Sequence, residues 1–510
     1  MTQQALRQKL PSDWAAREAL REKGQFWTPR WVAEAMVAYC LADEAESVFD
    51  PAVGAGAFFI AAKEMARKKR RRINLFGAEL DRDALRQAEI NGLSARDLER
   101  VVIGDFVLRP PDKLFPAIVA NPPYIRHHRL SSSTKESLRA LGAELIGKEL
   151  DGRAGLHVYF LLRALQALED GGRLAFIMPA DTCEGVFAGT LWRWITSRYR
   201  LDAVVTFTPE ASPFPNVDTN PIILLIRNAR PEAHYLWAKC RRAGSEALRE
   251  WIDAGFDPVS TDEITIHRRD LQEGLDSGLS RPPSERSDAG IALAEFTSVM
   301  RGIATGANDF FFLTRRRATE LKIPADMLLP AIGRTRDAPT EEITPDTLRQ
   351  LEAAGRPNLL FAPDGRELDD FPEAARNYLR QGRDAELDKR PLIATRRPWY
   401  KMEIRKAPPF LFAYLGRRNA RFIRNMAGVM PLTSFLCVYP RNEDADSIAR
   451  LWQALKHPDT VNNLARVGKS YGAGAIKVEP RALERLPIPD HVVAELSLTP
   501  TRSQTALFSN

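Results

Sequence analysis

Residues 47–69 read SVFDPAVGAGAFFIAAKEMARKK. A short apolar run of strand character ends at Asp50, a turn with Gly54 and Gly56 follows, and the pattern then becomes that of an amphipathic helix. Glycine lets such a turn bend tightly and brings the backbone close to a ligand. Because the GK[ST] ending of a phosphate-binding loop is missing, the turn predicts a ligand other than a nucleoside triphosphate.

The same strand and helix alternation continues to about residue 230 and predicts βαβ units in an α/β domain with a doubly wound parallel sheet. The helical pattern LHVYFLLRALQALEDGG spans residues 156–172. The strand-like runs are NLFGAEL at 74–80, RVVIGDF at 100–106, AIVAN at 117–121, RLAFIMP at 173–179, LDAVVTF at 201–207 and PIILLIR at 221–227.

Polar side chains close four of these runs: Asp50, Glu79, Asp105 and Asn121. Ligands of doubly wound sheets bind beyond the carboxyl ends of the strands, and an acid at the end of the second strand is typical for binding ribose hydroxyls. Asp105 could accept a hydrogen bond from an adenine amine, with Phe106 beside it to cover a ring face. The three acids favour a nucleoside ligand without phosphates.

The chain has 510 residues, which predicts two domains. We expect the sheet domain at 1–240, a connecting segment and linker at 241–290, a second domain at 291–490 and a tail at 491–510. The linker prediction comes from the Ser, Pro and Gly content of SGLSRPPSERSDAG at 277–290.

No apolar run reaches membrane-spanning length, and the first ten residues, MTQQALRQKL, lack the layout of a signal peptide. The four cysteines are scattered, so we expect reduced thiols, no metal site and a cytoplasmic protein. Residues 391–425 contain nine Lys and Arg residues and one Glu, with six aromatic residues between them. This basic-aromatic stretch favours contacts with nucleic acid phosphates and bases.

DPAVGAG, FGAEL, IGDF and the stretch IVANPPY at 118–124 follow one another in an order that resembles the S-adenosylmethionine-dependent DNA adenine-N6 methyltransferases of the gamma arrangement. Further stretches resemble segments of this family: GQFWTPRWVAEAM at 24–36, RLAFIMPA at 173–180, SPFPNVDTNPIILLIR at 212–227, RGIATGANDFFFL at 301–313 and SYGAGAIKVEPRALERLPIP at 470–489. One departure is Phe26, which is larger than the residue that some relatives carry there.

The resemblance implies a class I methyltransferase sheet that is mostly parallel, followed by a mixed α/β target recognition domain. It implies S-adenosylmethionine as cofactor. The implied cofactor-binding residues are Thr28, Asp50, Pro51, Ala52, Gly54, Gly56, Glu79, Asp105, Phe106, Asn121 and Phe176.

The resemblance assigns catalysis to Asn121, Pro122, Pro123, Tyr124 and Phe214. An adenine amine is a poor nucleophile, and two acceptors aimed at its N–H groups, the Asn121 side-chain oxygen and the Pro122 carbonyl, would stabilise the charge that develops as it attacks the methyl group. The prolines hold both acceptors rigid. Tyr124 offers a stacking face for a base rotated out of the duplex, and Phe214 a second aromatic contact.

Several alternatives remain open from the sequence. The NPPY motif also occurs in methyltransferases that modify a protein glutamine and in some that modify a ribosomal RNA guanine. Cytosine-N4 of DNA is a further alternative target, and the chain could also be a catalytically silent DNA-specificity module. The large second domain favours double-stranded DNA as the partner, with a separate restriction endonuclease or another defence protein acting beside a monomeric enzyme and with no membrane association.

Overall fold

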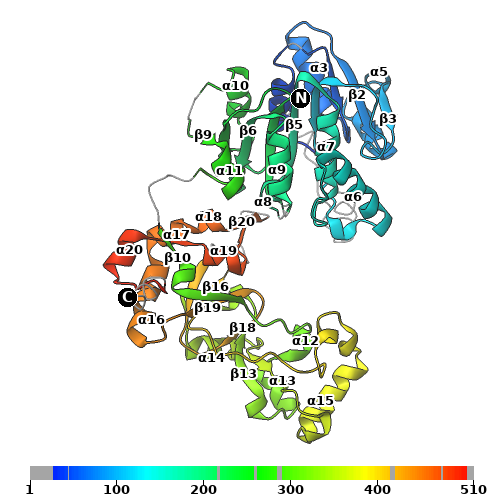
Figure 1. The fold of residues 1–510 in the computed structure, drawn as a ribbon. Coiled ribbons are helices and arrows are strands. Elements are labelled where there is room, and N and C mark those ends of the chain that lie inside the picture. Colours follow the sequence, from blue (N-terminus) through cyan, green and yellow to red (C-terminus); the bar gives the residue numbers. More distant parts are fainter. Residues whose placement is uncertain are drawn as a thin grey trace. The chain divides into compact units, whose positions relative to one another are not determined.

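The computed structural model describes residues 27–501 except 44, 186, 215, 216, 218, 258–260, 284–289, 414–419 and 472–474, and describes only the backbone of 128, 465, 466, 469–471 and 475–477. The chain divides into two compact units: the first runs to Pro283 and also includes Ser470 and Tyr471, and the second contains the other described residues. Figure 1 shows a helix-flanked sheet in the first unit and a mixture of short strands and helices in the second. Phe26, Tyr414, Arg417 and Arg418 lie outside the described residues.

The first unit is built on a nine-stranded sheet of order β3-β2-β1-β4-β5-β7-β6-β8-β9. Five neighbouring pairs are parallel and three are antiparallel, because β7 runs against β5 and β6, and β9 runs against β8. The strands are β1 Ser47–Asp50, β2 Asn74–Glu79, β3 Val101–Ile103, β4 Phe115–Ala120, β5 Leu168–Pro179, β6 Arg200–Phe207, β7 Pro221–Arg227, β8 His234–Cys240 and β9 Ile264–Asp270. The predicted doubly wound, mostly parallel sheet is confirmed.

Helices cover both faces of this sheet, and each face has its own hydrophobic core. Successive residues of a strand point to opposite faces, so in β4 Ala117 and Val119 enter one core, whereas Ile118 and Ala120 enter the other. The helices are α2 Arg30–Cys40, α3 Ala57–Lys68, α4 Arg82–Ile90, α5 Ala95–Leu98, α6 Ser132–Ile146, α7 Leu156–Gln166, α8 Asp181–Glu184, α9 Ala188–Thr196, α10 Ala247–Asp253 and α11 Leu271–Ser277. Helix α7 is shorter than predicted, because β5 already begins at Leu168.

The prediction that residues 241–290 connect the domains is wrong for their larger part. β9 pairs along its length with β8, and α10 buries Trp251 in the core that contains β1. The Trp251 ring also contacts Phe256, with ring centroids 4.9 Å apart. Residues up to Pro283 therefore extend the first unit.

The second unit contains a five-stranded sheet of order β11-β19-β16-β17-β14, a four-stranded sheet of order β12-β15-β13-β18, and the strand pair β10-β22. β20 and β21 form a further strand pair. The strands are β10 Gly290–Ala292, β11 Thr297–Arg301, β12 Phe312–Leu313, β13 Leu328–Ile332, β14 Glu342–Ile343, β15 Leu359–Phe361, β16 Phe410–Ala413, β17 Arg421–Asn425, β18 Met430–Pro431, β19 Phe435–Pro440, β20 Lys469–Tyr471, β21 Ala475–Lys477 and β22 Pro487–Pro489. The predicted mixed α/β architecture is confirmed.

The helices of this unit are α12 Asn308–Phe311, α13 Arg315–Glu320, α14 Pro345–Ala353, α15 Glu373–Asp384, α16 Ala445–Lys456, α17 Pro458–Asn462, α18 Leu464–Val467, α19 Pro480–Glu484 and α20 Asp490–Glu495. Residues after 490 are not simply a tail as predicted, because Val492 and Val493 are buried in the core of this unit. In the part of the chain that the structure describes, no helix combines the length and apolar character needed to cross a membrane.

The place of α10 in the first core gives a stability prediction. Trp251→Ala should lower the free energy of unfolding by about 3–5 kcal/mol, because it removes a large buried side chain from a packed core. The measurement is urea unfolding of the full chain, with Glu250→Ala, an exposed position on the same helix, as control. Equal stability of the two variants would contradict the assignment of residues 241–283 to the first unit.

Candidate active site

The turn after β1 is shaped by its acid and its glycines. Asp50 is fully buried, and its Oδ1 accepts a hydrogen bond from the Ala52 N–H at 3.0 Å. Gly54 and Gly56 have φ values of +55° and +80°, a region that favours glycine. A Cβ atom at Gly56 would also lie 2.5 Å from the Leu93 side chain. The turn therefore depends on both glycines.

Glu79, at the end of β2, holds the turn after β1 against the end of β2. One carboxylate oxygen accepts from the Gly54 N–H at 2.8 Å, and the other accepts from the N–H groups of Leu80 and Asp81 at 2.9 and 2.8 Å. The side chain is buried except for a small exposed part. Each oxygen can accept more than one hydrogen bond, so these contacts leave capacity for ligand hydroxyls.

The third predicted acid, Asp105, follows β3 and accepts hydrogen bonds from the N–H groups of Val107 and Leu108 at 2.9 and 3.1 Å. Phe106 beside it is buried, and its ring lies 5.5 Å from the ring of Phe160 in α7. The two phenylalanines form an apolar wall next to the acid.

These elements surround a cavity of about 710 Å³ at the carboxyl ends of β1, β2 and β4. The predicted residues that line it are Thr28, Pro51, Ala52, Gly54, Glu79, Asp105, Phe106, Asn121 and Pro123. Asp50, at the end of β1, and Gly56, in the turn, do not line the cavity, and neither do Pro122, Tyr124 and Phe214. Phe176 does not line it either, because in β5 it is fully buried in the core shared with α7.

Sequence reasoning missed several lining residues, among them Trp27, Asp81, Gln87, Leu156 and Phe160. Asp81 carried a signal, because it lies two positions after the strand-ending Glu79 and caps helix α4 through the Asp83 N–H at 3.0 Å. Leu156 and Phe160 lie at the start of α7, far along the chain from the cofactor turn, so only the fold brings them there.

The chemistry of the lining fits S-adenosylmethionine. Carboxylates at Glu79, Asp81 and Asp105 can accept hydrogen bonds from hydroxyl and amine groups and can face a cation, whereas they would repel phosphates. Asp50, which does not line the cavity, has a buried Oδ2 atom without a hydrogen-bond partner among the described residues. Burial raises the pKa of Asp50 well above its usual range.

The NPPY motif begins where β4 ends, and Asn121 lies at the edge of the cavity. Its Nδ2 donates a hydrogen bond to the buried Thr28 Oγ1 at 3.1 Å. In this orientation of the amide the Nδ2 group faces Thr28, and the oxygen is the end that can serve as acceptor for a ligand. Thr28, which precedes helix α2, thereby orients the side chain of Asn121, which lies 93 positions later in the chain.

Tyr124 is fixed by its hydroxyl, which donates to the Ile177 carbonyl of β5 at 3.0 Å. Burial raises the pKa of this hydroxyl well above its usual range, so it stays a donor. The Tyr124 ring is nearly perpendicular to the rings of Phe214 and His157, at centroid distances of 6.4 and 6.1 Å. The structure thus brings Tyr124 and Phe214 together as predicted from the resemblance and adds His157.

Several side chains of the basic-aromatic stretch are used within the second unit and not for the predicted contacts with nucleic acid. Phe410, Phe412 and Phe422 are buried in a core and cannot stack on bases. Arg396 donates to the carbonyls of Ala304 and Thr305 at 2.7 and 2.8 Å. Burial also lowers the pKa of Arg396.

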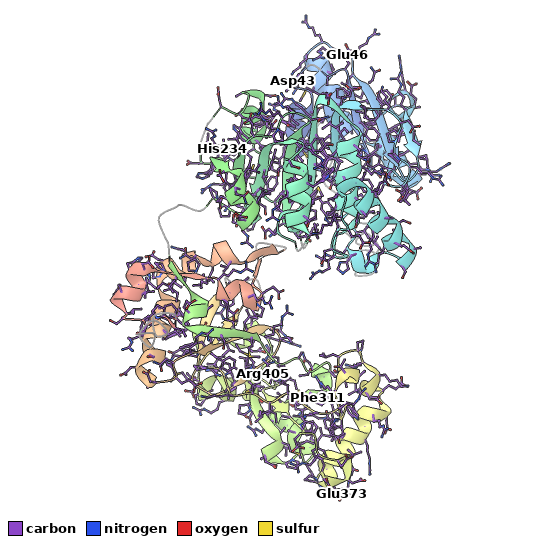
Figure 2. All side chains as sticks on the ribbon, viewed as in Figure 1. Asp43, Glu46, His234, Phe311, Glu373 and Arg405 are labelled. Atoms are coloured by element: carbon purple, nitrogen blue, oxygen red, sulfur yellow. The ribbon has the colours of Figure 1, made fainter. Side chains whose placement is uncertain are left out.

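Two further arginines of the stretch contact the protein itself. Arg405, labelled in Figure 2, donates to the Arg301 carbonyl at 2.6 Å. Arg421 donates to the Ala338 carbonyl. Several cations of the stretch are therefore structural, and the prediction that its aromatic residues stack on bases is wrong for the three buried phenylalanines.

One group of metal-ligating types occurs among the described residues, His457, Asp459 and His491, whose ligand atoms lie within 4.8 Å of one another. His491 Nε2 lies 3.0 Å from Asp459 Oδ2, and the Asp459 N–H donates to His457 Nδ1 at 3.3 Å. These hydrogen bonds account for the cluster, which belongs to the second unit and not to the cavity.

The sheet order and the cofactor cavity define a class I S-adenosylmethionine-dependent methyltransferase. Residues 12–239 match the family model "N-6 DNA Methylase", and residues 285–506 match the model "Type II methyltransferase M.Eco57I, C-terminal domain". The type II methyltransferase M.AccI of Acinetobacter calcoaceticus is 25% identical over 473 residues, which cover 92% of this chain and 85% of the relative. The type II methyltransferase M.XamI of Xanthomonas campestris pv. amaranthicola is 26% identical over 483 residues, 91% of this chain and 85% of that protein.

These matches identify an adenine-specific DNA methyltransferase with S-adenosylmethionine as cofactor, similar to the methyltransferases of type II restriction-modification systems. Among solved structures, the type IIL restriction-modification enzyme MmeI in complex with DNA has the same fold, with a TM-score of 0.55 and 12% identity. That alignment covers 91% of this chain, but this chain spans only 64% of MmeI.

The bonds of Glu79 give a prediction for cofactor affinity. Glu79→Gln should weaken S-adenosylmethionine binding at least tenfold, because a neutral amide accepts hydrogen bonds less strongly and would turn an NH2 group toward the turn or the ligand. Glu89→Gln, the same change at an exposed residue of helix α4 that does not line the cavity, is the control and should stay within about twofold. The measurement is calorimetric titration of each protein with the cofactor. Equal affinities for wild type and Glu79→Gln would exclude Glu79 from the site.

Proposed function

We propose that this enzyme transfers a methyl group from S-adenosylmethionine to the N6 amine of an adenine rotated out of duplex DNA at a specific sequence. The observation that carries the proposal is the bond from Asn121 Nδ2 to Thr28, which leaves the amide oxygen as the acceptor at the rim of the cofactor cavity. Bound S-adenosylmethionine supplies an electrophilic methyl group on a sulfonium ion. The residues of the chain orient the amine that attacks it.

Asn121 and Pro122 activate the amine as acceptors. The amide oxygen of Asn121 and the carbonyl of Pro122 would each accept one N–H of the adenine amine, which favours a pyramidal nitrogen and stabilises its developing positive charge. Pro122 and Pro123 limit backbone rotation, so both acceptors are in place before the base arrives. No general base is required before the attack, and the extra proton leaves afterwards.

Tyr124 and Phe214 hold the base. An adenine in a duplex is unreachable, and extruding it costs a few kcal/mol. Stacking on the Tyr124 ring offsets about 1–3 kcal/mol of this cost. Phe214, nearly perpendicular to Tyr124, would contact the base from its edge. The bond from the Tyr124 hydroxyl to Ile177 supports this role, because it holds the ring before DNA binds.

The second unit would provide sequence recognition. Two similarities support this role of the second unit. The unit matches the C-terminal domain of M.Eco57I, and most of the chain is similar to two type II methyltransferases. We expect the enzyme to act as a monomer on double-stranded DNA in the cytoplasm, beside a separate restriction endonuclease or another defence protein.

Replacement of the predicted acceptor tests this function. Asn121→Ala should lower the methyl transfer rate by at least ~10²–10³-fold, because it removes a preorganised hydrogen bond to developing charge. Cofactor affinity should change much less, since the residues of the β1 turn and Glu79 remain. The measurement is transfer of labelled methyl into duplex DNA. The control is Asn74→Ala, an exposed asparagine at the start of β2 that does not line the cavity.

Two outcomes would contradict the proposal. Asn121→Ala with the wild-type rate would exclude the mechanism. Wild-type enzyme that labels RNA, protein or cytosine N4 but no adenine would exclude the substrate.

The ring and the hydroxyl of Tyr124 have separable effects. Tyr124→Ala should lower activity strongly because the stacking face is lost, whereas Tyr124→Phe should keep most of it and lose only the bond to Ile177, about 0.5–1.5 kcal/mol. Methylation rates and base extrusion, followed by 2-aminopurine fluorescence at the target position, measure both effects. Equal losses for Phe and Ala would mean that anchoring by the hydroxyl, and not stacking, sets the activity.

A further inference from the structure

His157, the second residue of helix α7, is a buried polar side chain. Its exposed fraction is 4%, and neither ring nitrogen has a hydrogen-bond partner among the described residues. A buried donor or acceptor without a partner is unfavourable, so such groups need an explanation. A phenylalanine would fill the same space without this penalty.

The surroundings of His157 belong to the catalytic motif. Its ring lies 6.1 Å from the Tyr124 ring at an angle of 71°. The Leu156 N–H donates to the carbonyl of Ile125, the residue that follows the motif, at 3.0 Å. The start of α7 is therefore bonded directly to the end of the motif.

Gly155 shows how closely these parts fit. A Cβ atom at this position would lie 2.6 Å from His157 Cε1 and 2.9 Å from the Ile125 carbonyl oxygen. Leu156 and Phe160, on either side of His157 along the chain, line the cofactor cavity. His157 itself does not line that cavity, but its ring contacts Tyr124, which in turn contacts Phe214.

Burial lowers the pKa of His157, although Asp181 opposes this shift, and Arg126 acts in the same direction as burial. The imidazole is therefore neutral, with one N–H donor and one acceptor nitrogen. Adenine has ring nitrogens with acceptor lone pairs on both sides of its amine, at N1 and N7. A neutral imidazole N–H complements either of them.

We propose that His157 recognises the target base by donating a hydrogen bond from its ring to N1 or N7 of the extruded adenine. This inference rests on the proposed function. Asn121 and Pro122 would accept the two amine hydrogens, while His157 contacts the ring beside the amine and so fixes the rotation of the base in its plane. The hydrogen-bond partner that His157 lacks among the described residues would be supplied by the substrate.

The test combines protein and base substitutions. Genome sequencing first gives the methylated site, and duplexes are then prepared with adenine, 1-deazaadenine or 7-deazaadenine at the target. We expect one deaza base to lower kcat/KM of the wild type about 10–100-fold, the effect of leaving a site donor without its partner. In His157→Phe, the same deaza base should change the rate less than about threefold, since the contact is already absent. His157→Gln, which restores an N–H donor, should regain part of the discrimination.

The outcomes separate this inference from the proposed function. If wild type methylates all three duplexes equally, or if His157→Phe is slowed by each deaza base as much as wild type, the contact does not exist. If His157→Phe lowers the rate without changing discrimination, His157 only packs against Tyr124. If wild type does not methylate the unmodified adenine duplex, the proposed function fails instead. Thermal unfolding and cofactor titration of the variants establish that they are folded.

Discussion

The carboxylate of Glu79 is the interaction on which the cofactor site depends. It accepts hydrogen bonds from the backbone N–H of Gly54, in the turn after β1, and from those of Leu80 and Asp81, directly after β2. The ends of β1 and β2 are thus tied together across neighbouring parallel strands. Other N–H groups of the turn bond elsewhere: Ala52 to Asp50, Val53 to Ala78 and Gly56 to Val53. Glu79 is therefore the side chain that holds Gly54 against β2.

The catalytic motif is joined to this site by two side-chain bonds. β4 lies between β1 and β5, so the motif at its end is placed beside the cofactor turn. Asn121 is oriented by Thr28, and Tyr124 is anchored to Ile177 in β5. The acceptor and the aromatic ring are therefore held by different parts of the first unit before any substrate binds.

Much of this could be predicted from the sequence because it follows from local rules. Apolar runs that alternate with helical patterns predict the sheet, and polar residues at strand ends predict the edge where ligands bind. The residues predicted for cofactor binding that line the cavity, such as Glu79 and Asp105, lie directly at those ends.

Features that depend on tertiary packing could not be predicted in this way. The aromatic residues of the basic stretch alternate with cations, yet β16 and β17 turn Phe410, Phe412 and Phe422 into a core. Phe176 lies in a predicted strand, but the alternation of β5 directs it into the core with α7 and not into the cavity. His157 appeared as one residue of an amphipathic helix, and only the contact between α7 and the NPPY segment reveals its position.

The most direct test of the account is a structure of the enzyme with a non-reactive cofactor analogue and a duplex that carries its methylation site. The account predicts an extruded adenine stacked on Tyr124, with its N6 about 3 Å from both the Asn121 side-chain oxygen and the Pro122 carbonyl oxygen. An adenine that remains in the helix, or an amine that bonds to neither acceptor, would contradict it.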